Sequence, residues 1–215
     1  MAKEKIDVEE SARKRNVEAA DRNREMFRRA GVTVLNLIGS PGCGKTSILE
    51  YTARECEGRF AVVVGDVKTA LDAERIEASG IIAAPLETGG TCHLTAEMVR
   101  GAAQELDLDE IDYLFIENVG NLVCPSTFDL GEDEKVAVVS LPEGDDKVRK
   151  YPSLFSRAGM TFINKMDLLD AFPDYDVGRI KSDLRGLRSD MRIFQTSAKT
   201  GQGMGRWFEY LRGGG

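Results

Sequence analysis

The segment Gly-Ser-Pro-Gly-Cys-Gly-Lys-Thr at positions 39–46 constrains the fold of this chain more than any other feature. It fits the pattern G-x-x-x-x-G-K-[ST] and lies between an apolar run, Thr33–Ile38, and a helix-like stretch, Thr46–Glu57. A glycine-rich turn in that context lets backbone N–H groups and the positive end of the helix hold a phosphate. We expect Lys45 to neutralise the β- and γ-phosphates and the Thr46 hydroxyl to ligate Mg²⁺. The residues expected around the phosphates are Gly39, Gly42, Cys43, Gly44, Lys45, Thr46 and Ser47.

Six further apolar runs follow, and amphipathic stretches separate them. The runs are Phe60–Gly65, Ile81–Ala84, Tyr113–Ile116, Val136–Val139, Met160–Ile163 and Arg192–Gln195. Because apolar runs without alternation suit strands buried on both faces, this order predicts repeated βαβ units. We therefore expect an α/β, three-layer P-loop NTPase fold, with a mostly parallel sheet of about seven strands, over residues 31–215. Residues 1–30 are mostly polar or charged, which predicts a helical arm that leans on the domain or binds a partner.

The composition narrows the functional class. The net charge is −7, from 29 Lys and Arg against 36 Asp and Glu, which disfavours general binding to nucleic acid or to anionic membranes. No apolar run approaches the ~18 residues of a membrane-spanning helix, and the first ten residues are too charged for a signal peptide. We therefore expect a cytoplasmic protein whose four cysteines are reduced thiols.

Acidic residues follow two of the predicted strands. Glu117 ends the run in Phe-Ile-Glu-Asn-Val-Gly, and Gly120 follows three residues later. A strand-end carboxylate can hold Mg²⁺ through water, and a glycine N–H can sense the γ-phosphate. Asp66 follows another buried run and could share the metal or position water, and Asp72 is a second candidate with helix capping as its alternative role. The predicted catalytic residues are Lys45, Asp66 and Glu117, and the predicted magnesium residues are Thr46, Asp66, Asp72 and Glu117.

Two further segments predict recognition of guanine. Asn-Lys-Met-Asp at 164–167 follows a predicted strand, and an ionised Asp167 can accept two hydrogen bonds from guanine N1–H and its amino group. Adenine offers no such donor pair, so the carboxylate would be left poorly satisfied. Lys165 would lie along the base, and Asn164 would brace the loop. Ser197, Ala198 and Lys199 follow another strand, where backbone N–H groups could reach the guanine oxygen.

Three residues form a candidate metal site. Cys92 is adjacent to the single histidine, His93, and Cys124 follows Glu117 by seven residues. Thiolate and imidazole suit Ni²⁺ or Zn²⁺, but a closed site needs about four ligands, and adjacent residues often cannot both face one ion. A symmetric dimer would solve this by sharing ligands, whereas the two cysteines could instead be small buried hydrophobes. We expect Cys56 to lie in the core and the Cys43 thiol to face solvent or a partner.

Taken together, these motifs resemble a known family. The resemblance rests on GSPGCGKT, GDVKTALDAER, ETGGTCHL, FIENVGNLVCP, FDLGE, EGDDKVRKYP and NKMD, and it covers roughly residues 30–200. The chain is similar to the hydrogenase nickel incorporation family HypB, which belongs to a class of P-loop GTPases that also contains the urease accessory protein UreG. The adjacent Cys-His favours the hydrogenase branch, because most UreG-like proteins carry Cys-Pro-His.

The resemblance implies a GTPase that delivers nickel to the [NiFe] centre of hydrogenase. It implies a nucleotide-dependent homodimer with Cys92, His93 and Cys124 at the interface, and maturation proteins and the hydrogenase large-subunit precursor as partners. It also implies GTP or GDP with Mg²⁺ as ligands, and Ni²⁺ at a site that Zn²⁺ could occupy. Residues 1–30 contain no Cys or His, so a separate N-terminal nickel site is not expected here.

Hydrolysis could alter metal affinity, because seven residues link Glu117 to Cys124. No residue obviously positions the attacking water, so slow intrinsic turnover is expected. The alternatives are UreG-like delivery to urease, a regulatory GTPase without metal, and a metal-binding module whose nucleotide only stabilises a dimer. A P-loop kinase is a further alternative, against which the guanine motif argues.

Overall fold

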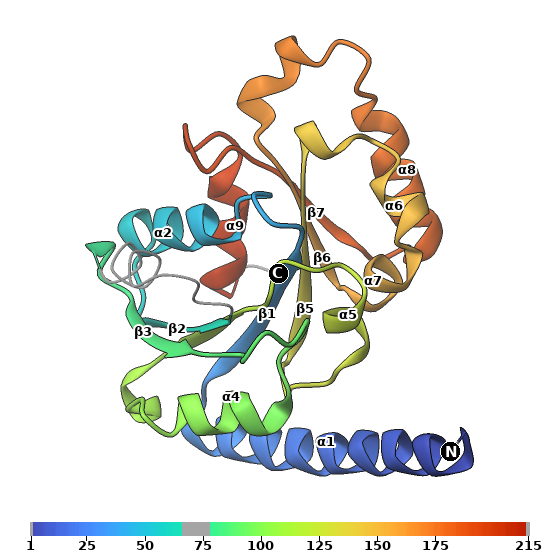
Figure 1. Cartoon of the computed structure of the whole chain (residues 1–215). Helices are drawn as coiled ribbons and strands as arrows, with labels where there is room; N and C mark the ends of the chain where they lie inside the picture. Colours follow the sequence, from blue (N-terminus) through green and yellow to red (C-terminus); the bar gives the residue numbers. More distant parts are fainter. Residues whose placement is uncertain (1, 66–77, 214–215) are drawn as a thin grey trace.

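The sheet contains seven strands, and every pairing in it is parallel (Figure 1). The computed structural model describes residues 2–65 and 78–213. The strand order is β3-β2-β4-β1-β5-β6-β7, which confirms the predicted α/β fold class. The strands are β1 (Thr33–Gly39), β2 (Phe60–Gly65), β3 (Ile82–Leu86), β4 (Tyr113–Glu117), β5 (Glu134–Ser140), β6 (Met160–Asn164) and β7 (Arg192–Gln195).

Helices cover both faces of the sheet. One face carries α2 (Lys45–Glu55) and α9 (Met204–Leu211), and the other carries α1 (Ala2–Ala30), α4 (Ala96–Ala103), α7 (Pro152–Arg157) and α8 (Val177–Leu187). The short elements are α5 (Cys124–Thr127), α6 (Lys147–Lys150), η1 (Leu108–Glu110), η2 (Leu141–Glu143) and η3 (Met166–Ala171). One of the amphipathic stretches between the apolar runs, Asp72–Ser79, is helix-like in sequence, but it falls almost entirely outside the described residues.

Successive side chains of each strand point to opposite faces of the sheet, so each strand contributes to the hydrophobic core on both sides. In β1, Leu35 and Leu37 pack under α2 and α9, whereas Val34 and Ile38 face the opposite layer. Side chains on both faces are buried, as the unbroken apolar runs predicted. Asn36 lies among them and is fully buried, so its amide requires hydrogen-bond partners inside the protein.

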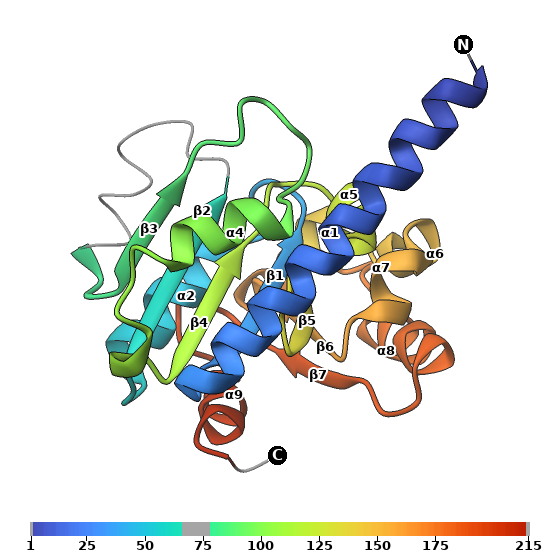
Figure 2. The same ribbon diagram turned by 90° about the horizontal axis from the view of Figure 1, so that it is seen from below.

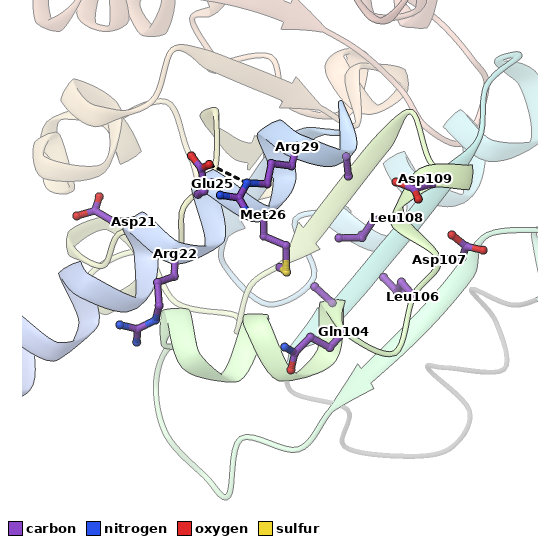
Figure 3. A pocket seen from close by; sticks show the side chains of 12 residues that line it. Asp21, Arg22, Glu25, Met26, Arg29, Gln104, Leu106, Asp107, Leu108 and Asp109 are labelled. Carbon is purple, nitrogen blue, oxygen red and sulfur yellow. Dashed lines mark hydrogen bonds and ion pairs between the residues drawn. The ribbon is translucent and has the colours of Figure 1, made fainter.

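Helix α1 crosses the second face diagonally, and its N-terminal turns extend past the other elements (Figure 2). Its C-terminal half packs closely, because Ala19, Ala20 and Phe27 are buried against the domain. Close to the C-terminal end of α1, a groove separates it from α4 and the segment after α4 (Figure 3). This groove lies away from residues 39–46 and carries both acidic and basic side chains.

Because all strands run in the same direction, their carboxyl ends lie at one edge of the sheet. In open parallel sheets this edge is where ligands bind. The loops that leave it carry nearly all the residues singled out from the sequence. Among the described residues, no helix has both the length and the apolar character needed to cross a bilayer.

Candidate functional site

The glycine-rich segment forms a loop that joins β1 to α2. Lys45 is 6% exposed, and its Nζ donates hydrogen bonds to the carbonyls of Gly39 (3.2 Å) and Ser40 (3.4 Å). Gly44 has φ +101°, and a Cβ there would collide with the Asn164 amide, so only glycine suits this position. The ammonium therefore lies over a loop of the shape that encloses a phosphate.

The Thr46 hydroxyl contacts the acid at the end of β4. Its Oγ1 donates to Glu117 Oε1 at 2.6 Å, and the two residues are 71 positions apart in the chain. A hydroxyl and a carboxylate oxygen that close form a donor set suited to a hard cation such as Mg²⁺. Asp66 and Asp72, the other acids predicted for this role, lie outside the described residues.

The loop after β4 packs directly on the phosphate loop. A Cβ added to Gly120 would lie 2.7 Å from Cγ and 3.1 Å from the backbone nitrogen of Pro41. Any larger side chain would push the two loops apart. The backbone of Gly120 thus lies beside residues 39–46, as a γ-phosphate sensor requires.

The predicted guanine residues also meet at this edge. Asn164 Nδ2 donates to the Cys43 carbonyl (3.0 Å), and Asn164 Oδ1 accepts from the Ala198 N–H (3.2 Å). Lys165 has φ 62° and donates from Nζ to the Gly42 carbonyl (2.6 Å).

The carboxylate at the end of the same segment is also held in place. Asp167 Oδ1 accepts from the Ser197 hydroxyl at 2.6 Å. Lys199 is exposed beside this corner. The structure therefore joins the segments 164–167 and 197–199 to each other and to the phosphate loop.

One sequence-based expectation is wrong. The Cys43 thiol does not face solvent or a partner, because Cys43 is fully buried in the core beneath the phosphate loop. A Cβ on Gly39 would lie 2.6 Å from its Sγ, so the turn directs the thiol inward. Burial raises the pKa of this thiol to about 11, which leaves it protonated and unreactive near neutral pH. Cys43 therefore contributes to the site through its backbone and not through its thiol.

The candidate metal ligands lie together at the surface. The ligand atoms of Cys92, His93 and Cys124 all lie within 4.8 Å of one another, and Cys92 Sγ is 3.5 Å from His93 Nδ1. The two adjacent residues do therefore face one point. Cys92 is exposed, and Cys124 is partly exposed rather than a core residue. Cys56 is buried, as expected.

Neighbouring groups orient this metal cluster, defined as Cys92, His93 and Cys124. The His93 ring stacks on Phe128 with ring centroids 3.7 Å apart, and Asn121 Nδ2 donates to the Cys92 carbonyl (3.2 Å). Partial burial lowers the pKa of His93, so the imidazole is neutral at pH 7 and has a lone pair for a metal. A hydrogen bond with Cys124 raises the pKa of the Cys92 thiol.

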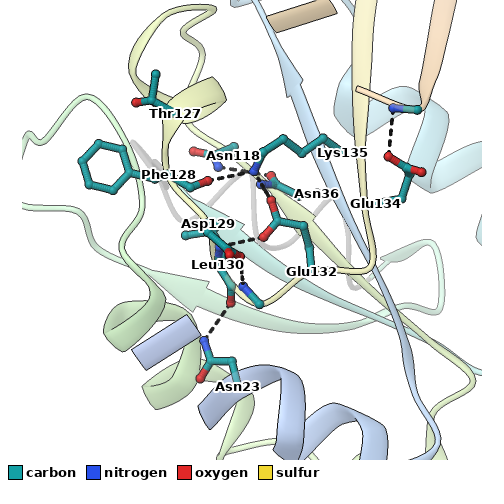
Figure 4. Close-up of polar contacts among 12 residues, drawn as sticks. Asn23, Asn36, Asn118, Thr127, Phe128, Asp129, Leu130, Glu132, Glu134 and Lys135 are labelled. Atoms are coloured by element: carbon teal, nitrogen blue, oxygen red, sulfur yellow. Dashed lines mark hydrogen bonds and ion pairs between the residues drawn. The ribbon is translucent and has the colours of Figure 1, made fainter. Parts of the chain in front are cut away.

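Sequence reasoning missed a buried chain of hydrogen bonds that links Asn118 to Phe128 (Figure 4). Asn118 Nδ2 donates to Asn36 Oδ1 (3.1 Å), and Asn36 Nδ2 donates to Glu132 Oε1 (3.1 Å). Lys135 Nζ donates to Glu132 and to the Phe128 carbonyl (2.8 Å). This series of hydrogen bonds therefore runs from Asn118, which follows Glu117, to Phe128, whose ring stacks on the His93 imidazole. The one available signal was the asparagine inside the apolar run Thr33–Ile38.

Comparisons with known proteins agree with this geometry. The family model described as "CobW/HypB/UreG, nucleotide-binding domain" matches residues 33–195. The hydrogenase maturation factor HypB of Escherichia coli K12 is 44% identical over 208 residues, which cover 96% of this chain and 71% of that protein.

Two solved structures have the same fold. HypB from Helicobacter pylori, crystallised in complex with nickel, has a TM-score of 0.88 at 39% identity and covers 93% of this chain and 94% of that one. HypB from Archaeoglobus fulgidus has a TM-score of 0.86 at 39% identity, with coverages of 93% and 98%. The matched motifs, the sheet and the overall identity thus agree, and the chain belongs to the HypB family of hydrogenase maturation factors, within the CobW/HypB/UreG nucleotide-binding proteins.

Proposed function

We propose that this chain hydrolyses GTP to control the binding and delivery of nickel during maturation of [NiFe] hydrogenase. The observation that carries the proposal is the metal cluster, whose ligand atoms lie within 4.8 Å of one another. The segment that supplies Cys124 begins at Glu117, and Gly120 within it packs on the phosphate loop. A change at the γ-phosphate could therefore move Cys124 through the short segment that begins at Glu117.

The nucleotide side of the proposal uses residues that meet at the sheet edge. Lys45 would stabilise charge on the transferred phosphoryl group, and Thr46 and Glu117 would hold Mg²⁺, which would supply positive charge to the phosphate oxygens. Asp66 and Asp72 remain proposed magnesium residues, and Asp66 a proposed catalytic one. The residues proposed to recognise guanine are Asn164, Lys165, Asp167, Ser197, Ala198 and Lys199. We expect turnover by the isolated protein to be slow, because the sequence contains no residue that obviously positions the attacking water.

The metal side of the proposal leaves one coordination position open. The metal cluster supplies three ligands, whereas closed sites usually have four. A second copy of this chain, related by a two-fold axis, would offer the same donors to one ion on that axis, so the two copies together would close the site, and the partly exposed cluster is open to such an approach. Zn²⁺ fits the same ligands, and delivery ends on the hydrogenase large-subunit precursor. To act as a switch, the two nucleotide states must differ in nickel affinity by about 1–3 kcal/mol.

Nickel binding in two nucleotide states tests the proposal. The tag-free chain is titrated with Ni²⁺ in the presence of a non-hydrolysable GTP analogue, and again with GDP. We expect nucleotide-dependent binding of one nickel per two chains, lost in Cys124→Ser and kept in Cys56→Ala, which removes a buried thiol elsewhere. Two nickel ions per dimer would keep the delivery role but replace the shared ion with a two-ion site. Binding that ignores Cys124, or no specific binding at all, would overturn the metal site.

A further inference from the structure

Two asparagines on α1 face the domain rather than solvent. Asn16 and Asn23 are seven residues apart, so they lie on the same face of the helix. Asn23 is fully buried and Asn16 is half-buried, although most neighbouring residues of α1 are exposed. Burying an amide costs free energy unless it is hydrogen-bonded, so the hydrogen-bond partners of these two side chains show which segments α1 is tied to.

Each asparagine bridges the same two segments. Asn16 Nδ2 donates to the Asp129 carbonyl (2.8 Å), and its Oδ1 accepts from the Ala96 N–H (2.9 Å). Asn23 Nδ2 donates both to the Ala96 carbonyl and to the Leu130 carbonyl, each at 2.8 Å. One segment is therefore the first residue of α4, and the other is the loop at 129–130.

These two segments flank the metal cluster. Ala96 lies three residues after His93, and residues 129–130 directly follow Phe128, whose ring stacks on the imidazole. Cys124 begins the short helix that leads into the same loop. Helix α1 therefore holds together the segment that follows the imidazole and the segment that follows its stacking partner.

The loop fits closely against α1 as well. Gly131 has φ +87°, and a Cβ there would lie 2.6 Å from the Ala20 carbonyl oxygen and 2.6 Å from Asn23 Cβ. Arg24 Nη1 donates to Asp21 Oδ1 at 2.8 Å, and Nη2 donates to both carboxylate oxygens of Asp129 at 2.9 Å. A shift of this loop would therefore break several contacts at once.

We propose that Asn16 and Asn23 are positioning residues for the metal cluster, and that α1 presets His93 for metal binding before any ion arrives. The inference rests on the proposed function in that the metal cluster is the nickel site. Groups that orient a metal ligand without touching the metal typically change affinity 10–100-fold when they are removed. Fixing the ligand in advance lowers the entropy lost on binding.

The first test needs no metal. His93 is the only histidine, so its ring protons give identifiable NMR signals in a tag-free chain. In the native chain, stacking on Phe128 shifts these signals upfield, and Phe128→Leu defines how far they move when the ring is lost. We expect Asn16→Ala to move them part of that way and the double variant N16A/N23A to move them further. Asn16→Ala carries the test if the double variant does not fold.

The second test measures nickel affinity. We expect the dissociation constant for Ni²⁺ to rise about 10–100-fold in the asparagine variants, while affinity for GDP stays within about twofold. Thr52→Val is the matched control, because it removes a buried hydrogen bond with Trp207 (2.9 Å) from the opposite layer and tests general loss of stability. We expect its His93 signals and nickel affinity to match those of the native chain.

The outcomes separate this inference from the proposed function. Unchanged His93 signals and unchanged nickel affinity in the asparagine variants would overturn the inference even if Cys124→Ser abolishes binding. Equal changes in Thr52→Val would also overturn it, since the effect would then be one of stability. If nickel binding ignores Cys124, the proposed metal site fails and the link to nickel fails with it. The NMR signals would still show whether α1 positions the histidine.

Discussion

The phosphate loop and the metal cluster lie on the same edge of the sheet, yet they differ in how far their polar groups are enclosed. Around the phosphate loop, Lys45, Thr46 and Asn164 each bond to another group of the same chain, and Lys45 is 6% exposed. At the metal cluster, Cys92 is exposed, and Val123 beside Cys124 is 56% exposed.

This difference in enclosure supports the proposal that a second chain completes the metal site but not the nucleotide site. The described nucleotide residues come from four strand ends, those of β1, β4, β6 and β7, which the parallel sheet holds rigidly at fixed separations. The metal ligands come from one loop and from the first residue of the short helix α5, offer three donor atoms, and have apolar surface next to them. Enclosed nucleotide residues beside an open metal cluster fit the proposal that one nucleotide state recruits a second chain.

Thiol labelling should show the largest contrast between the two regions. With a pKa of about 11, only about one in 10³ of the Cys43 thiols is ionised at pH 8, and the group is also fully buried. We expect Cys92 and Cys124 of the native chain to react with a thiol reagent at least about 10³-fold faster than Cys43, and bound Zn²⁺ to protect them. Mass spectrometry after timed quenching measures this, and rapid labelling of Cys43 would contradict the enclosed loop.

The same thiol predicts a pH dependence. Its pKa is raised on folding, so its contribution to stability is complete below the pKa of about 9 of the unfolded chain and is lost as the pH rises through about 11. Cys43→Ala should therefore flatten the loss of melting temperature between pH 9 and pH 11. An unchanged pH profile would show that the thiol is not buried as described.

The next largest effect is expected on GTP hydrolysis, when the Lys45 ammonium is removed from the phosphate loop. Lys45→Ala leaves the transferred phosphoryl charge without its ammonium, and we expect the turnover rate to fall about 10²–10³-fold. Steady-state phosphate release measures this. Nickel binding to the nucleotide-free chain should remain, because Lys45 does not contact the metal cluster. Loss of both would mean that the two regions are not separately built.

Changing the guanine residue should have a smaller effect. Asp167→Asn replaces an acceptor pair for guanine by a group that also carries donors, and two charge-assisted hydrogen bonds are weakened. We expect the preference for GDP over ADP to fall about 10²-fold, with Asp170→Asn as a control on the same short helix. Competition binding with a fluorescent nucleotide measures the ratio, and an unchanged preference would remove Asp167 from base recognition.

Interrupting the buried chain of hydrogen bonds should have the smallest effect. Asn118→Ala removes the donor to Asn36, which is the first link between β4 and the Phe128 loop. We expect the ratio of nickel affinities between the GTP-analogue and GDP states to fall about 2–10-fold, whereas affinity in the GDP state changes little. An unchanged ratio would leave the backbone from Glu117 to Cys124 as the only route between the two regions.

Much of the fold could be predicted because the strands are buried on both faces. Each apolar run became a strand, and the boundaries moved by at most a few residues, as from Val136–Val139 to Glu134–Ser140. The amphipathic stretch Leu94–Leu106 predicts a helix, and α4 begins within it at Ala96, since the Thr95 side chain accepts from the Met98 N–H and caps it. The short helices α5 and α6 were not predicted, because four residues carry no readable period.

The candidate site divides in the same way. Residue types and spacing were enough to select the phosphate loop, the guanine residues and the metal cluster. They could not place the Cys43 thiol, because a turn that encloses a phosphate also decides which side chain points inward. Nor could they show that Asn23 and Asn36 are buried, since the partners of Asn23 lie 73 and 107 positions away and those of Asn36 lie 82 and 96 positions away.

The sequence by itself determined the parallel α/β architecture, the nucleotide motifs and the identity of the three metal-ligand candidates, because these depend on local patterns and residue chemistry. Only the tertiary structure decided that adjacent Cys92 and His93 face one point with Cys124, and that α1 ties the loop after Phe128 to the start of α4. Such contacts join segments distant in the chain. Their distances are set by how helices pack on the sheet, which no local pattern encodes.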